Sequence, residues 1–131
     1  FDAADLSMME QDGTLVSVIL HEMGHVLGIG TLWQSSGFLS GYGGPSPTFT
    51  GTHAVAEYNA IFGTNATGVP VESGGGPGTA YAHWSEAVFD NELMTGYING
   101  STQPLSRITA ASLWDLGYTV NLNAADAYTP P

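Results

Sequence analysis

The fold of this chain is best predicted from residues 15–27, LVSVILHEMGHVL. Thr14 is a suitable N-cap and Gly28 a suitable C-terminal stop, so we expect a helix over about residues 15–28. Apolar residues occur on nearly all sides of this helix, a pattern typical of a helix that is buried all round.

Within this helix, His21, Glu22 and His25 form the pattern HExxH. Residues i and i+4 of a helix lie on one face, so both imidazoles can reach one metal ion. Glu22 lies about 100° round the helix from His21, where its carboxylate can approach a metal-bound water without being a ligand. The pattern predicts peptide hydrolysis in which Glu22, as general base, activates that water. Burying these ionisable groups in an apolar helix costs several kcal/mol, and a bound metal is the natural compensation.

A catalytic zinc ion needs a third protein ligand, which the sequence alone leaves open. The chain contains no cysteine, so the ligand must be His, Asp or Glu. Thr31 occupies the position at which the compact pattern HExxHxxGxxH would place a third histidine. The candidates elsewhere in the chain are His53, His83, Glu57 and Glu86.

Length and composition predict one domain, residues 1–131, with 43% hydrophobic residues available for a core. Arg107 is the only Lys or Arg against twelve Asp and Glu, and the net charge is −11. Such a balance argues against nucleic acid and anionic membranes as partners. No apolar run is long enough for a membrane span, and the acidic surface suits a secreted protein.

The remaining segments predict an α+β fold dominated by helix and loop. We expect a second helix over 54–62 and a C-terminal helix over about 106–116, with Ser106 as its N-cap. The other expectations are an irregular segment over 1–13, a loop over 30–52, an edge strand over 69–71 and a short strand over 118–122.

Three stretches of the chain resemble the leishmanolysin branch of the metzincin metalloproteases: HEMGHVLGIGTLW from His21, HWSEAVFDNELMTGYI from His83 and LSRITAASLWDLGY from Leu105. The resemblance implies a metzincin-like catalytic core. It also implies that His21, His25 and His83 bind zinc, that Glu22 is the general base, and that Met94 forms a turn beneath the metal.

The chain departs from this family in two respects. Leishmanolysins are rich in cysteine, and the absence of cysteine here suggests a bacterial relative. Metzincins place a twisted sheet before the active-site helix, whereas only twenty residues precede His21. We therefore expect a fragment from which the N-terminal sheet is largely absent, and a complementary N-terminal segment or chain as a partner.

The sequence thus predicts a zinc-dependent endopeptidase acting on protein or peptide substrates. The alternative is a non-catalytic, zinc-stabilised binding module of a larger secreted protein. Tyr97 could donate to an oxyanion, although we expect a buried aromatic there. Calcium bound by Asp90, Asn91 and Glu92 is a weaker expectation, because adjacent acceptors without a recognised loop are more often a solvated turn.

Overall fold

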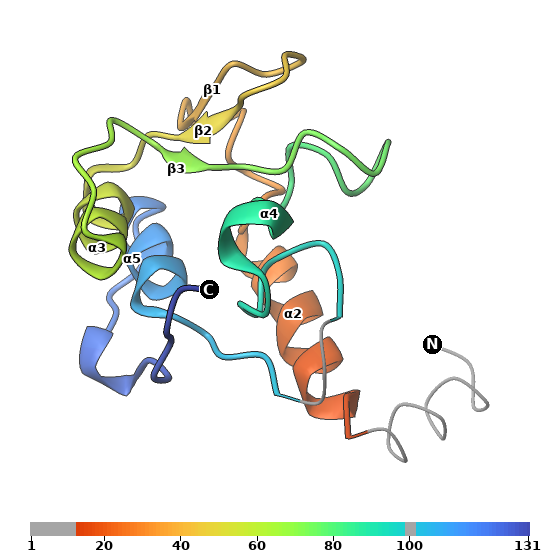
Figure 1. Cartoon of the computed structure of the whole chain (residues 1–131), viewed down its shortest axis with the longest axis vertical. Helices are drawn as coiled ribbons and strands as arrows, with labels where there is room; N and C mark the ends of the chain where they lie inside the picture. Colours follow the sequence, from red (N-terminus) through yellow and green to blue (C-terminus); the bar gives the residue numbers. More distant parts are fainter. Residues whose placement is uncertain (1–12, 99–101) are drawn as a thin grey trace.

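The computed structural model describes residues 13–98 and 102–131, so the segment expected to be irregular over 1–13 lies, except for Gly13, outside the described residues. The described part is an α+β fold in which helices outweigh a small sheet (Figure 1). Its elements in chain order are α2 (Leu15–Leu27), β1 (Leu39–Ser40), β2 (Thr48–Phe49), α3 (Thr52–Phe62), β3 (Val69–Pro70), α4 (Glu86–Phe89), α5 (Arg107–Asp115) and the 3₁₀ helix η1 (Leu122–Ala124).

The sheet is antiparallel, with strand order β1-β2-β3. Phe49 of the central strand pairs with Leu39 on one side and with Val69 on the other. β3 therefore forms an edge, as predicted for a segment containing Pro70, which has no N–H to donate. The expected loop over 30–52 contains β1 and β2, which are too short to give a periodic pattern in the sequence.

Helices α3 and α5 pack against each other beside the sheet (Figure 1). The carboxylate of Asp115, at the end of α5, accepts the backbone N–H groups of His53 and Ala54 at 2.9 Å each. It thereby satisfies N–H groups that the first turn of α3 leaves without a partner within the helix. Arg107 at the start of α5 donates to Glu57 of α3 at 2.8 Å, which adds a second polar link.

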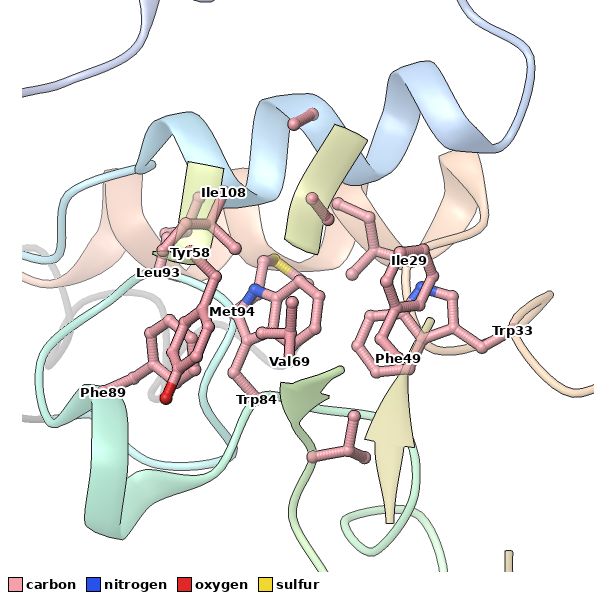
Figure 2. Close-up of a cluster of buried hydrophobic side chains, with 13 residues drawn as sticks. Ile29, Trp33, Phe49, Tyr58, Val69, Trp84, Phe89, Leu93, Met94 and Ile108 are labelled. Atoms are coloured by element: carbon pink, nitrogen blue, oxygen red, sulfur yellow. The ribbon is translucent and has the colours of Figure 1, made fainter. Parts of the chain in front are cut away.

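The core is aromatic and lies between the sheet and the helices. Trp33, Phe49 and Trp84 are fully buried, and their rings meet with centroids 4.6–5.7 Å apart. Figure 2 shows Trp84 beside Met94 in the middle of this cluster, between a group containing Trp33 and a group containing Phe89.

Helix α2 is not buried all round, so that expectation is wrong. Gly24 is its only buried residue, whereas Val16 is 68% and Val26 86% exposed. The physical reason is that the rest of the described chain packs only on the face that carries the histidines. The other face exposes further apolar side chains, namely Ile19, Leu20, Met23 and Leu27.

Two smaller expectations also fail. No strand forms over 118–122: Tyr118 donates its hydroxyl to the carbonyl of Leu27 at 2.8 Å, and the chain then turns into η1. A strand needs a partner for its backbone groups, and none of the described strands runs beside this segment. Thr14 stands at the N-cap of α2 but makes no side-chain capping bond, whereas Ser106 caps α5 by accepting from the N–H of Thr109.

None of the helices in the described part of the chain combines the length and the hydropathy that a membrane span requires.

Candidate metal centre

The geometry of α2 brings His21 and His25 together. They are one helical turn apart on the face that packs against the rest of the described chain, and their Nε2 atoms are 2.9 Å from each other. The helix ends immediately after this pair, because Gly28 adopts φ 119, a left-handed conformation that favours glycine. This turn carries the carbonyl of Ile29 back to Nδ1 of His25, at 2.8 Å.

His83 reaches the same point from the segment between β3 and α4. Its Nε2 is 3.2 Å from Nε2 of His21 and 3.0 Å from Nε2 of His25, and the residue is 6% exposed. The approach depends on Gly30, because a Cβ at that position would overlap the backbone carbonyl of Ala82. The turn after α2 and the segment that carries His83 are thus in direct backbone contact.

Each of the three imidazoles is oriented by a backbone carbonyl. Nδ1 of His21 lies 2.8 Å from the oxygen of Leu93, and Nδ1 of His83 lies 2.9 Å from the oxygen of Thr79. The third pair is Nδ1 of His25 with Ile29, already described. A carbonyl oxygen only accepts hydrogen bonds, so Nδ1 carries the proton in all three rings. Nothing in the sequence indicated these acceptors, because every residue has a carbonyl.

The three Nε2 atoms therefore point bare lone pairs at one another. Their separations of 2.9–3.2 Å have the length of hydrogen bonds, but none of them has a proton to donate. Three converging lone pairs repel one another unless a cation lies between them. A tetrahedral zinc ion with Zn–N bonds of about 2.0–2.1 Å separates its nitrogen ligands by roughly 3.3 Å. The three histidines fit such an ion closely.

The surroundings of His21 and His83 favour the neutral form of both rings. Burial, helped by the nearby His25 and His21, lowers the pKa of His83 to about 4 against the raising effects of Thr79 and Glu22. The pKa of His21 is lowered as well, again chiefly by burial. Neutral imidazole is the form that binds a metal, so these two rings are ready to bind without first losing protons near neutral pH.

Glu22 lies beside this cluster without belonging to it. Its side chain is exposed, and its charge acts on the pKa of both His21 and His83. A cavity of about 170 Å³ opens next to it. The cavity is lined by residues of α2 and by the segment after Met94, namely Ser17, Val18, His21, Glu22, Thr95, Gly96, Tyr97, Ile98 and Gln103. Water or a ligand in this cavity can therefore reach Glu22 and His21 from the same side.

Tyr97 differs from its expected state. It is 46% exposed and lines the cavity, so the expectation of a buried aromatic is wrong. Its backbone carbonyl accepts from Nε2 of Gln103 at 3.0 Å, and Gln103 also lines the cavity.

Met94 lies directly against α2 at the level of the histidines. It is fully buried, and a Cβ on Gly24 would come within 2.8 Å of its sulfur. Gly24 sits between Glu22 and His25 in the sequence, so the absence of a side chain there gives Met94 room beneath the cluster.

The other candidate ligands lie elsewhere. The ring of His53 stacks on Trp114 at 3.4 Å, and Glu57 pairs with Arg107. Among the described residues, the only group of three or more His, Asp or Glu that could hold a metal is His21, His25 and His83, and it excludes Glu86. The expectation of calcium gains no support, because the carboxylate of Glu92 is fully buried and hydrogen-bonded inside the fold.

Comparisons with known proteins agree with the resemblance seen in the sequence. The model of the leishmanolysin family of peptidases matches residues 1–129. The chain is 39% identical over 77 residues to a leishmanolysin-like peptidase of Drosophila melanogaster, a match that covers 57% of this chain and 11% of that protein. A leishmanolysin-like peptidase of Drosophila pseudoobscura pseudoobscura is 40% identical over 73 residues, covering 54% of this chain and 10% of the relative.

These matches also set the scale of the chain. It spans about a tenth of the length of the two curated relatives. Neither relative is bacterial, so the expected bacterial origin has no support in these comparisons.

Proposed function

The chain belongs to the leishmanolysin family, and on this basis we propose that it forms the metzincin-like catalytic core of a zinc-dependent endopeptidase. The observation that carries the proposal is the convergence of three Nε2 lone pairs, from His21, His25 and His83, beside an exposed glutamate.

In this proposal His21, His25 and His83 hold the ion, with the fourth position left open for chemistry. When bound, zinc lowers the pKa of a water molecule to about 7 and polarises the carbonyl of the scissile peptide. The Leu93, Ile29 and Thr79 carbonyls keep the three rings in the tautomer that this requires.

Glu22 acts as the general base. Its carboxylate takes a proton from the attacking water as the oxygen bonds to the peptide carbon. The same carboxyl group then passes that proton to the amide nitrogen, and the C–N bond breaks. The exposure of Glu22 at the rim of the cavity suits this role, because both water and substrate must reach it.

A second candidate function is a non-catalytic, zinc-stabilised binding module. The observation in its favour is the apolar outer face of α2, on which Val16 and Val26 are largely exposed. In the endopeptidase this face would be covered by a complementary segment or chain. In a binding module it would be the recognition surface itself.

Glu22 separates the two functions. Glu22→Gln should lower kcat/KM on an unstructured protein substrate by about 10²–10⁴-fold, the contribution typical of a general base. Zinc should stay at one ion per chain, because Glu22 is not a ligand. Zinc content is measured on the purified variant alongside the protease assay. A wild-type chain that binds zinc but cleaves nothing, with or without its complementary segment, would favour the binding module.

The third ligand is tested by a matched pair of histidine variants. His83→Ala should lower zinc content, whereas His53→Ala should leave it unchanged, because His53 stacks on Trp114 away from the cluster. The opposite pattern would refute the ligand set.

A further inference from the structure

Glu92 is a fully buried carboxylate that the proposed mechanism does not use. One oxygen accepts the backbone N–H of Met94 at 2.9 Å. The other accepts the hydroxyl of Thr109 at 2.6 Å and lies 3.4 Å from that of Ser106, both at the start of α5. A buried carboxylate with this many partners is held in one position and in turn holds the groups that donate to it.

One of the groups that donate to Glu92, the backbone N–H of Met94, belongs to the turn that supports His21. The N–H of Thr95 donates to the carbonyl of Glu92 at 3.2 Å, which closes the turn over residues 92–95. Within this turn, the carbonyl of Leu93 faces Nδ1 of His21 at 2.8 Å. The Glu92 carboxylate binds the N–H of Met94, the residue after Leu93, so it fixes the peptide unit that carries this acceptor.

The same network reaches the residue that follows a second histidine, His83. The Thr109 hydroxyl, which donates to Glu92, also accepts Nε1–H of Trp84 at 2.9 Å. Trp84 follows His83 directly, and its backbone N–H donates to the carbonyl of Met94 at 3.0 Å. The turn that supports His21 and the segment that carries His83 are therefore tied to each other and to α5 through Glu92 and Thr109.

We propose that Glu92 is a positioning residue of the metal centre: its carboxylate, with Thr109, sets the Leu93 carbonyl against His21 and anchors Trp84 beside His83. This inference rests on the proposed metal centre and adds a residue that neither the HExxH pattern nor the three-histidine cluster contains.

The electrostatics agree with a geometric role. Burial raises the pKa of Glu92 to about 7, although its hydrogen bonds to Thr109, Met94, Ser106 and Leu93 favour the ionised form. An acid at this position therefore lowers the stability of the fold relative to an apolar side chain of similar size. The acid is nevertheless placed where it can order the Leu93 carbonyl and, through Thr109, the Trp84 side chain.

The decisive comparison uses two variants of Thr109, one without the hydroxyl and one that keeps it. Thr109→Val removes the bond to Glu92 and the partner of Trp84, whereas Thr109→Ser keeps a hydroxyl in place. We expect the zinc Kd of Thr109→Val, measured by chelator competition, to rise by about 10–100-fold, the range seen when the groups that orient metal ligands are lost. The visible spectrum of its Co²⁺ form should change as well. Thr109→Ser should bind zinc like the wild type, and Glu92→Leu should behave like Thr109→Val if it folds.

A control variant separates positioning from general loss of stability. Asp115→Ala removes a carboxylate that accepts two backbone N–H groups of α3, away from the histidines. It should lower Tm and leave both the zinc Kd and the Co²⁺ spectrum unchanged. The inference is overturned if Thr109→Val binds zinc like the wild type, or if Asp115→Ala weakens binding equally. A wild-type chain that binds no zinc would refute the metal centre itself, so the two failures are distinguishable.

Discussion

Replacing Gly30 by alanine should damage the proposed metal centre without changing any histidine. A Cβ at Gly30 would lie 2.7 Å from the carbonyl carbon of Ala82 and would overlap its oxygen. Ordinary contacts between carbon atoms are roughly 3.5–4.0 Å, so the two backbone segments would have to separate by about 1 Å. Ala82 precedes His83, which must move with it.

A displacement of this size is large for a metal ligand. Distances in a real metal site fall within about 0.2 Å of their standard values, and a shift of about 1 Å is several times that tolerance. We therefore expect Gly30→Ala to raise the zinc Kd by at least about tenfold, comparable with the loss of a group that orients a ligand. The measurement is chelator competition on the folded protein, together with the Co²⁺ spectrum.

Gly37 provides the matched control. Its φ of 79 is close to the 74 of Gly30, so alanine at either position meets a left-handed backbone that costs roughly 1–2 kcal/mol. No atom lies within 4 Å of a Cβ at Gly37. Gly37→Ala should thus lose about as much stability through backbone strain as Gly30→Ala does, and it should keep its zinc affinity. Equal zinc affinity in the two variants would show that the contact with Ala82 does not position His83, and the reasoning would fail.

Two further predictions concern the groups beneath the cluster. Met94→Leu conserves volume in a full core and should lower the free energy of unfolding by less than about 1.5 kcal/mol, whereas Met94→Ala should lower it by about 2–5 kcal/mol. Urea denaturation measures both losses, and equal losses would contradict the packing of Met94 against Gly24. Glu92 should make the metal-free protein less stable as pH rises, because its pKa in the folded state, about 7, exceeds the ordinary value of 4.5. Its contribution to the free energy of unfolding is therefore fully present below pH 4.5 and is lost as the pH rises through 7. The difference in unfolding free energy between wild type and Glu92→Gln should therefore fall by at most about 3 kcal/mol between pH 4.5 and 8, and an unchanged difference would refute the raised pKa.

The sequence predicted elements whose signals are local. The helix over residues 54–62 and the C-terminal helix were found because Gly63 and Ser106 mark their ends by their own conformational and capping preferences. α4 was missed because a helix of one turn has no periodicity to detect. β1 and β2 escaped notice for the same reason, since each is only two residues long.

Expectations that depend on distant parts of the chain fared differently. The apolar composition of α2 predicted burial but could not show which segments would cover the helix. The described chain covers one face only. The strand expected over 118–122 had a suitable pattern but no partner in the sheet. Spacing alone could not choose His83 among the candidate ligands, because 58 residues separate it from His25. The choice came from the resemblance, and the structure brings those two rings together.

Because the three imidazoles are oriented by main-chain carbonyls, the sequence can change at the accepting positions without loss of the acceptors. An acceptor on the main chain is present whatever amino acid occupies its position, so no single substitution at Ile29, Thr79 or Leu93 can delete it. Related chains can therefore differ at these three positions and still orient their histidines identically, provided that the path of the backbone is kept. Whether related chains keep this arrangement then depends more on the glycines and buried side chains that set the path of the backbone than on the identity of the residues whose carbonyls accept the hydrogen bonds.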